Sequence, residues 1–264
     1  MKPIMLGLNG ACGRLGVEVI RAALADPGVR LVAALECAGH PHLGRDVGDL
    51  AAAGTAGVVV AARPGVRPDA MIDGSLPAGT AKILAYCVAR RVPLVVCTTG
   101  LPAGLQRRLR AAAKRIPILQ SANMSAGGNL LAHLAAEAVR ILGAGYDVEI
   151  IEAHHRLKKD APSGTALLIA EHIRETSGGN RKFVLGRRGA TAGRDPREIG
   201  ISAVRGGDIV GDHMVMLAGP GERIELIHRA HSRRTFACGA VRAAKYLVGR
   251  KPGLYRMADV LDMK

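Results

Sequence analysis

Residues 4–16 have the sequence Ile4-Met-Leu-Gly-Leu-Asn-Gly10-Ala-Cys-Gly13-Arg-Leu-Gly16, and this stretch decides the fold. Its apolar start predicts a buried strand, and the residues from about Gly13 to Ala25 have the pattern of a helix. Glycines between a strand and a helix allow a tight turn and a close approach of the backbone to a ligand. A pyrophosphate can then bind at the N-terminus of the helix.

The spacing of these glycines is G-x-x-G-x-x-G, which an ordinary glycine-rich turn would also satisfy. A second apolar run, residues 29–35, leads into Glu36, which follows Gly16 by twenty residues. A carboxylate at that place accepts hydrogen bonds from the ribose of a dinucleotide. The next residue is Cys37 rather than an arginine that would pair with a 2′-phosphate. This favours NADH, although Arg14 leaves NADPH open.

Short apolar runs alternate with helical stretches along the first half of the chain, as in βαβ units that build a parallel sheet covered on both faces. From about residue 125 the pattern changes, and three strands separated by turns rather than helices predict a second sheet of mixed or antiparallel type. The expected strands are 4–8, 29–35, 58–60, 70–72, 93–97, 116–119, 148–153, 199–204, 213–217 and 223–228, and the expected helices are 13–25, 78–90, 103–115, 127–142, 163–176 and 234–249. The Gly- and Arg-rich residues 177–197 are expected to form a mobile loop region, and a short tail is expected after the last helix.

The composition excludes several classes of protein. No apolar run approaches the about 20 residues that span a bilayer, and the N-terminus lacks a secretory signal pattern, so a cytoplasmic protein without membrane contact is expected. The five cysteines form no C-x-x-C pair, which argues against a disulfide framework and a zinc site. The net charge of +15 is spread along a chain that is 2% aromatic and therefore lacks stacking platforms, so we expect anionic metabolites rather than nucleic acid as ligands.

Residues 152–166, Glu152-Ala-His154-His155-Arg-Leu-Lys158-Lys-Asp-Ala-Pro-Ser163-Gly164-Thr165-Ala, predict a small-anion site with a proton donor. Imidazole exchanges a proton near neutral pH, lysine binds carboxylates, and a helix that starts at Ser163-Gly164-Thr165 favours an anion. Adjacent histidines on a strand point to opposite faces, and no third ligand at helical spacing is evident. No metal site is therefore expected at His154 and His155.

Two further loops follow strands at the edge where open α/β sheets bind ligands. They are Cys97-Thr98-Thr99-Gly100 and Ala122-Asn123-Met124-Ser125, whose backbone and hydroxyl groups can position a nicotinamide carboxamide. Taken alone, each loop is more typical of a plain connection or a helix N-cap than of a cofactor contact.

With these residues assembled, the chain closely resembles the dihydrodipicolinate reductases of bacterial lysine and diaminopimelate synthesis. The matching features extend over the whole chain. Besides the segments quoted above they are Gly44-Arg-Asp46-Val-Gly48, Ala203-Val-Arg205-Gly-Gly-Asp-Ile-Val-Gly-Asp-His213, Gly219-Pro-Gly-Glu-Arg-Ile-Glu225 and His228-Arg-Ala-His-Ser-Arg233. The His-His…Lys…Ser-Gly-Thr segment is highly specific, whereas the glycine turn alone is not.

The resemblance implies a role for each matching residue. His154 corresponds to the general acid and Lys158 to the catalytic lysine, and the implied substrate-binding residues are His155, Gly164, Thr165 and Arg233. The implied cofactor-binding residues are Gly10, Ala11, Cys12, Gly13, Arg14, Leu15, Gly16, Glu36, Cys97, Thr98, Thr99, Ala122, Asn123, Met124 and Ser125.

The implied activity is NAD(P)H-dependent reduction of 4-hydroxy-tetrahydrodipicolinate to tetrahydrodipicolinate, with loss of water, in a homotetramer assembled through the second sheet. The expected architecture is α/β, with an N-terminal Rossmann-type doubly wound parallel sheet and a second α+β domain that contains a mixed sheet. Residues 1–124 form the expected dinucleotide-binding domain, to which 235–264 return, and 125–234 form the expected substrate-binding and oligomerisation domain.

The chain departs from the family pattern at three places. It has Asp73-Gly74-Ser75 where the family usually has Asp-Phe-Thr or Asp-Phe-Ser, Cys97 where a glycine is usual, and Gly128 where valine is frequent. The first two departures concern the cofactor side and none removes a predicted catalytic group. Two alternatives remain, a related dehydrogenase of the aspartate type and a non-catalytic dinucleotide-binding protein.

Overall fold

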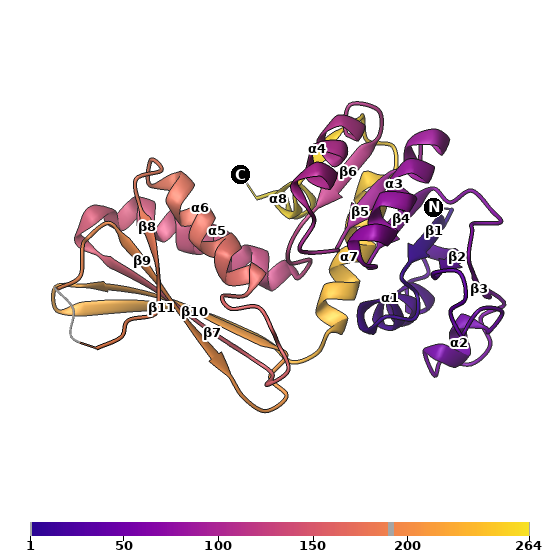
Figure 1. The fold of residues 1–264 in the computed structure, drawn as a ribbon. Coiled ribbons are helices and arrows are strands. Elements are labelled where there is room, and N and C mark those ends of the chain that lie inside the picture. Colours follow the sequence, from indigo (N-terminus) through magenta and orange to yellow (C-terminus); the bar gives the residue numbers. More distant parts are fainter. Residues whose placement is uncertain (1, 190–192, 264) are drawn as a thin grey trace. The chain divides into compact units, whose positions relative to one another are not determined.

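The structure is a computed structural model that describes residues 2–189 and 193–263, and the chain divides into two compact units (Figure 1). Unit 1 comprises Met1–Ala126 and Arg233–Lys264, and unit 2 comprises Gly127–Ser232. Unit 1 contains a parallel sheet and unit 2 a mixed one, so the predicted fold class is confirmed. No helix within the described ranges has the length and apolar character needed to cross a membrane.

The sheet of unit 1 has seven strands in the order β12-β6-β5-β4-β1-β2-β3, and every neighbouring pair is parallel. The chain leaves β1 toward β2 on one side and later returns to β4 on the other, so the order reverses beside β1. Ligands of open α/β sheets bind at such a reversal, beyond the carboxyl ends of the strands. The strands are β1 (Ile4–Asn9), β2 (Val29–Leu35), β3 (Val60–Ala61), β4 (Ala70–Asp73), β5 (Leu94–Val96), β6 (Pro117–Gln120) and β12 (Gly253–Tyr255).

Helices cover both faces of this sheet because its central strands are apolar on both sides. Ile72 on β4 packs in the core beneath α1 and α7, whereas Met71 packs in the core beneath α3 and α4. A Cβ atom at Gly239 of α7 would lie 1.8 Å from the carbonyl oxygen of Met124, so α7 packs directly on the loop after β6. The helices are α1 (Arg14–Ala25), α2 (Val47–Leu50), α3 (Pro77–Arg90), α4 (Ala103–Ala112), α7 (Arg234–Leu247) and α8 (Met257–Leu261).

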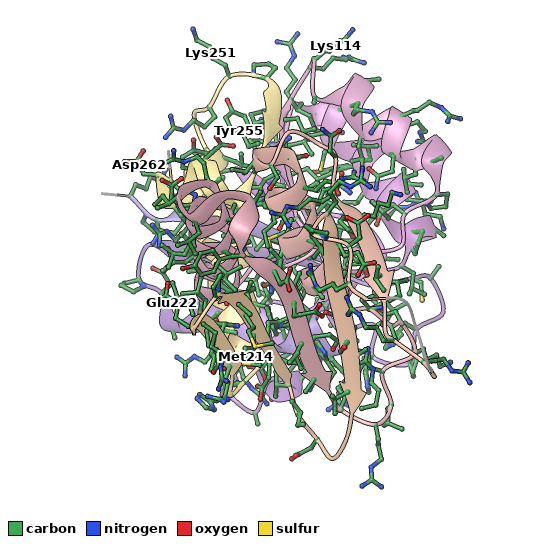
Figure 2. All side chains as sticks on the ribbon, turned by 90° about the vertical axis from the view of Figure 1, so that its left-hand side faces the viewer. Lys114, Met214, Glu222, Lys251, Tyr255 and Asp262 are labelled. Carbon is green, nitrogen blue, oxygen red and sulfur yellow. The ribbon has the colours of Figure 1, made fainter. Side chains whose placement is uncertain are left out.

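The prediction of a short tail after the last helix is wrong, because this segment forms β12 and α8. Leu254 and Tyr255 pair with Ile118 and Leu119 of β6 and extend the sheet. The labelled side chain of Tyr255 lies in this region, and its hydroxyl donates to the carbonyl of Lys251 over 2.9 Å (Figure 2). β12 has only three residues, and so short an apolar pattern does not predict a strand. The segment forms a strand because it pairs with β6, which lies more than a hundred residues earlier in the chain.

Unit 2 is a five-stranded mixed sheet in the order β11-β10-β7-β9-β8. β10 runs antiparallel to β7 and β11, whereas β7 and β8 run parallel to β9. Apolar residues of α5 and α6 pack with Val148, Ile150, Val215 and Leu217 in one core on one face of this sheet. The elements are α5 (Ala126–Leu142), a 3₁₀ turn (Gly143–Gly145), β7 (Asp147–His154), α6 (Gly164–Thr176), β8 (Lys182–Leu185), β9 (Glu198–Arg205), β10 (Gly211–Gly219) and β11 (Glu222–Ala230).

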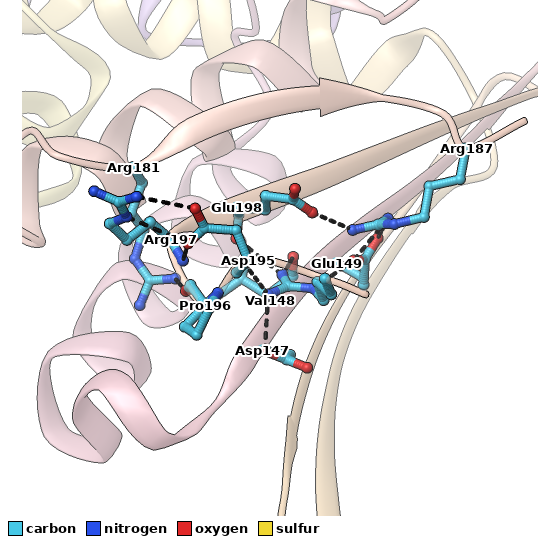
Figure 3. Close-up of polar contacts among 10 residues, drawn as sticks. Asp147, Val148, Glu149, Arg181, Arg187, Asp195, Pro196, Arg197 and Glu198 are labelled. Carbon is cyan, nitrogen blue, oxygen red and sulfur yellow. Dashed lines mark hydrogen bonds and ion pairs between the residues drawn. The ribbon is translucent and has the colours of Figure 1, made fainter. Parts of the chain in front are cut away.

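The prediction of a loop region over 177–197 is wrong at residues 182–185, which form β8 (residues 190–192 lie outside the described ranges). Arg187 and Arg194, which follow β8, also form ion pairs (Figure 3). Arg194 donates to Asp147 Oδ1 and to the carbonyl of Val148, both over 2.8 Å, and Arg187 pairs with Glu198 over 2.7 Å. The Arg-rich composition that suggests a solvated loop therefore provides partners for the acidic residues of β7 and β9.

Candidate functional site

The glycine turn lies at the carboxyl end of β1, and glycine is required at two of its positions. Gly10 has a φ of +84°, in the left-handed region that favours glycine. A Cβ atom at Gly16 would lie 2.1 Å from the carbonyl oxygen of Gly10, so the first turn of α1 packs directly on the loop. The amides of Gly10 and Ala11 donate to the carbonyl of Leu35, which ties the turn to the end of β2.

Gly13 is the N-cap of α1, where it provides no capping side chain, and the first turn of this helix contains no acidic residue. The first amides of a helix need acceptors, and an anion favours that position. This geometry fits the pyrophosphate of a dinucleotide.

Glu36 lies beside the same turn, as expected for a ribose-binding carboxylate. Its Oε2 accepts from the amide of Cys12 over 3.3 Å, and its Oε1 accepts from the amide of Cys37 over 3.0 Å. Burial, and then the charge of Glu36, raises the pKa of the Cys12 thiol. Cys12, Glu36 and His40 each offer one metal-ligand atom, and these atoms all lie within 4.8 Å of one another. Sequence reasoning, which argued against a zinc site at the cysteines and a metal site at His154 and His155, did not find this cluster.

The Asp73-Gly74-Ser75 loop is organised by the carboxylate of Asp73, which is fully buried at the end of β4. Asp73 Oδ1 accepts from Asn9 Nδ2 over 2.7 Å and from Ser75 Oγ over 2.6 Å. Its Oδ2 accepts from Thr80 Oγ1 over 2.6 Å and from Thr98 Oγ1 over 3.0 Å. Asp73 therefore holds the ends of β1, β4 and β5 together, including the Thr98 loop predicted to contact the nicotinamide.

The two departures on the cofactor side fit into this arrangement. A Cβ atom at Gly74 would have its nearest neighbour, Leu15 Cδ2, at 3.4 Å, so the position would accept a Cβ atom in ordinary van der Waals contact. The amide of Cys97 donates to the carbonyl of Asp73 over 2.8 Å, and burial, with Asp73 next, raises the pKa of the Cys97 thiol. Cys97 is therefore a protonated thiol beneath the loop.

The last predicted cofactor loop, residues 122–125, follows β6. The amide of Ser125 donates to Asn123 Oδ1 over 2.7 Å, and Ser125 Oγ contacts Thr235 Oγ1 of α7 at 3.3 Å. Asn123, Met124 and Ser125 are buried, whereas Ala122 is exposed. All the residues predicted for the cofactor thus lie in unit 1, in loops that follow its parallel strands or, for Arg14, Leu15 and Gly16, in the first turn of α1.

In unit 2, His154 is the last residue of β7 and is buried. Its Nδ1 lies 2.6 Å from Oε2 of Glu152, and Arg205 donates to both oxygens of Glu152 over 2.8 Å. The amide of Ser163 adds a bond to Oε1 over 3.0 Å. Burial alone would raise the pKa of Glu152, but the hydrogen bonds from His154 and Arg205 hold it at about 2.

An ionised Glu152 can only accept, so His154 Nδ1 carries a proton and the ring is fixed in one orientation. Nε2 is then the ring nitrogen left for a reacting group. A Cβ atom at Gly211 would lie 3.1 Å from this Nε2, so glycine at the start of β10 leaves room beside it.

His213 lies next to His154, with ring centroids 5.2 Å apart in an edge-to-face arrangement. Its Nε2 lies 3.1 Å from Ser163 Oγ, which also accepts from the amide of Ala166 and so caps α6. Burial, followed by the charge of His154, lowers the pKa of His213 to about 3, so this ring is neutral at pH 7.

Sequence reasoning did not assign roles to Glu152, Arg205 or His213, and it placed Ser163 only at the start of a helix. Side chains alternate between the two faces of β7, so Glu152 lies on the same face as His154. This pattern could have indicated a role for Glu152.

The remaining predicted catalytic and substrate residues of unit 2 lie in the segment after β7 and in the first turn of α6. Lys158 Nζ forms an ion pair with Asp160 Oδ2 over 2.8 Å. Gly164 is the first residue of α6, and Thr165 is buried in its first turn. Arg233, also predicted to bind the substrate, belongs to unit 1 as the N-cap of α7.

Two glycine substitutions should separate packing from cofactor binding. Gly16→Ala is expected to lower the thermal midpoint of unfolding markedly, because its Cβ would meet Gly10 O at 2.1 Å. Gly13→Ala, whose Cβ would meet Gly10 O at 3.4 Å, should leave that midpoint unchanged and still weaken NADH binding. Differential scanning fluorimetry and calorimetric titration with NADH measure the two effects. Equal losses of stability in both variants would contradict this assignment.

The comparisons with known proteins cover the whole chain. The family model "Dihydrodipicolinate reductase, N-terminus" matches residues 4–124 and "Dihydrodipicolinate reductase, C-terminus" matches residues 127–261. A 4-hydroxy-tetrahydrodipicolinate reductase of Magnetococcus marinus is 47% identical over 99% of both chains. One of Thiobacillus denitrificans is 48% identical over 99% of both chains.

Solved structures share the fold. A dipicolinate-bound dihydrodipicolinate reductase from Paenisporosarcina sp. TG-14 aligns with a TM-score of 0.75 at 22% identity, covering 97% of this chain and 98% of the other. GenD2 from gentamicin A biosynthesis, in complex with NAD, aligns with a TM-score of 0.63 at 16% identity, covering 99% and 91%. Both family models and the full-length relatives show that the chain belongs to the dihydrodipicolinate reductase family.

Proposed function

We propose that this chain catalyses the NAD(P)H-dependent reduction of 4-hydroxy-tetrahydrodipicolinate to tetrahydrodipicolinate. The observation that carries the proposal is the imidazole of His154, held by an ionised Glu152, in the segment that also contains Lys158 and the start of α6. This segment supplies a proton donor and cations for a dicarboxylate, as the reaction requires.

The residues of unit 1 fit a dinucleotide. The amides at the start of α1 would hold the pyrophosphate, Glu36 would accept from the ribose, and the loops at Thr98 and at 122–125 would position the nicotinamide. When bound, NAD(P)H supplies a hydride to the substrate ring. Asp73 acts through Thr98, because its carboxylate accepts a hydrogen bond from the Thr98 hydroxyl and so fixes the side chain in its loop.

His154 is proposed to deliver the proton that balances the hydride. In the imidazolium form both ring nitrogens carry protons, so Nδ1 keeps its hydrogen bond to Glu152 while Nε2 donates. Lys158 would exchange Asp160 for a substrate carboxylate, because Asp160 is more than half exposed and weakly held. His155, Gly164, Thr165 and Arg233 are the other proposed substrate contacts.

We further propose a cytoplasmic homotetramer assembled through the sheet of unit 2. The helices α5 and α6 cover one face of this sheet (Figure 1). The strand register places Ile151, Met214 and Ile227 side by side on the other face, where Ile227 is 45% exposed. A second copy of the chain would remove this apolar surface from water. The five cysteines are all free thiols, as is usual in a reducing compartment.

The decisive experiment measures oxidation of NADH and of NADPH with freshly generated 4-hydroxy-tetrahydrodipicolinate as the substrate. We expect turnover with at least one cofactor, and no turnover with either would refute the proposed activity. Oxidation of L-aspartate with NAD⁺ as the acceptor would instead support an aspartate-type dehydrogenase. Tight cofactor binding without any turnover would support a non-catalytic dinucleotide-binding protein.

A further inference from the structure

Cys12, Glu36 and His40 form a compact cluster of three different metal-ligand types. The thiol, the carboxylate and one imidazole nitrogen lie within 4.8 Å of one another, and all three residues are half-buried. Thiolate and imidazole together are typical ligands of Zn²⁺ and of softer divalent cations, whereas Mg²⁺ and Ca²⁺ take oxygen ligands. The donor set therefore indicates a cation of the zinc class.

Hydrogen bonds donated by backbone amides hold the two loops that carry these ligands. Cys12 and Glu36 are joined by the bond from the Cys12 amide to the Glu36 carboxylate, over 3.3 Å. The amide of His40 donates to the carbonyl of Cys37 over 3.1 Å, so a tight turn brings His40 back toward Glu36. The three side chains consequently come together through fixed backbone rather than through flexible surface segments.

We propose that Cys12, Glu36 and His40 bind one zinc-class divalent cation, and that the bound cation excludes the dinucleotide. Zinc bonds of about 2.0–2.3 Å place tetrahedral ligand atoms roughly 3.3–3.7 Å apart, so the cluster needs a contraction of about 1 Å. Small rotations of half-buried side chains provide this contraction. A water molecule completes the fourth position, as in other sites with three protein ligands.

Two existing interactions are replaced by bonds to the cation when it binds. The Cys12 thiol releases its proton, because only the thiolate is a metal ligand. His40 gives up the bond that its Nδ1 accepts from the amide of His42 over 3.2 Å, since coordination through either ring nitrogen removes that acceptor. Both exchanges remain within the loop after β2 and the glycine turn, so the sheet is unaffected.

The cation and the dinucleotide compete because both need the carboxylate of Glu36. The exclusion of the dinucleotide rests on the proposed function. A Glu36 carboxylate that coordinates a cation no longer accepts from ribose hydroxyls. The cation also occupies the edge of the glycine turn at Cys12, beside the proposed pyrophosphate site. Linkage is reciprocal, so the dinucleotide must weaken cation binding by the same factor.

The test for the site uses the full chain without cofactor, titrated with CdCl₂. We expect one equivalent of Cd²⁺ to produce the ultraviolet charge-transfer band of a cadmium–thiolate bond. Cys12→Ser should abolish the band, and His40→Ala should weaken Cd²⁺ binding at least tenfold. The matched control is Cys37→Ser, which changes an exposed thiol outside the cluster and should keep the band. A band that persists in Cys12→Ser, or that disappears in Cys37→Ser, would overturn the proposal, and circular dichroism checks that each variant is folded.

The test for exclusion measures NADH binding by calorimetry, with and without saturating Cd²⁺. We expect Cd²⁺ to weaken NADH binding at least tenfold in the unmodified chain and to leave it unchanged in Cys12→Ser. An unchanged affinity in the presence of bound Cd²⁺ would overturn the exclusion. The charge-transfer band needs neither substrate nor turnover, so a failure of the proposed reductase activity leaves the result for the metal site intact.

Discussion

His154→Gln is expected to lower kcat by about 10²- to 10³-fold, the usual contribution of a general acid. Glutamine keeps a polar group that can reach Glu152, which binds His154 Nδ1 at 2.6 Å, but it has no proton to donate near neutral pH. The affinity for NADH should not change, because every proposed cofactor contact lies in unit 1 and His154 lies in unit 2. Steady-state kinetics and calorimetric titration with NADH separate the two effects.

His133→Gln is the matched control for this prediction. His133 lies on α5, is half-buried, and belongs to the same unit without being part of the proposed site. It should keep the kcat of the unmodified chain. A collapse of NADH affinity in His154→Gln, with kcat retained, would remove the support for a general acid at this position.

The strands of unit 1 from β1 to β6 were predictable because each carries its own apolar signal and ends at a recognisable loop. Ala70, Met71 and Ile72 of β4 are buried on both faces, so the sequence shows a continuous apolar run. The glycine turn and Glu36 were predictable as a pair for a similar reason, since a fixed connection of β1, α1 and β2 separates them. Local patterns were sufficient for these elements.

Elements that depend on a distant partner were not predictable. β8 has no fully buried residue, and it exists as a strand because it pairs with β9. The bidentate contact between Glu152 and Arg205 joins residues that are 53 positions apart. Register between β7 and β9 brings their ends together, and a single sequence does not specify that register.

Asp73 illustrates the same limit at the cofactor loop. The sequence analysis identified Asp73-Gly74-Ser75 as a departure from the family pattern and expected its effect on the cofactor side. In the structure the carboxylate of Asp73 forms the organising contacts, with Asn9, Thr80 and Thr98 contributed by three other segments. A buried polar network of this kind is specified by tertiary packing rather than by local sequence.

Glu152→Gln is expected to lower the free energy of unfolding by about 3 kcal/mol at pH 7, as when one partner of a buried ion pair is removed. The Glu152 side chain is fully buried and that of Arg205 is 20% exposed. Water therefore solvates the charge of Arg205 only in part once its partner is removed. Arg205→Gln alone should also destabilise the chain. The double variant should lose less than the sum of the two single losses, because each single change leaves one charge without its main partner.

The pH dependence of unfolding tests the same pair. The pKa of Glu152 falls from its ordinary value of 4.5 to about 2 in the folded chain, so the folded state favours the ionised carboxylate. This contribution, about 3 kcal/mol, is present above pH 4.5 and is lost as the pH falls toward 2. Urea unfolding at pH 7, 4 and 3 should therefore show the difference between the unmodified chain and Glu152→Gln decreasing with acidity. A difference that stays constant over this range would mean that Glu152 is not held ionised by Arg205 and His154, and the fixed orientation of the His154 ring would lose its cause.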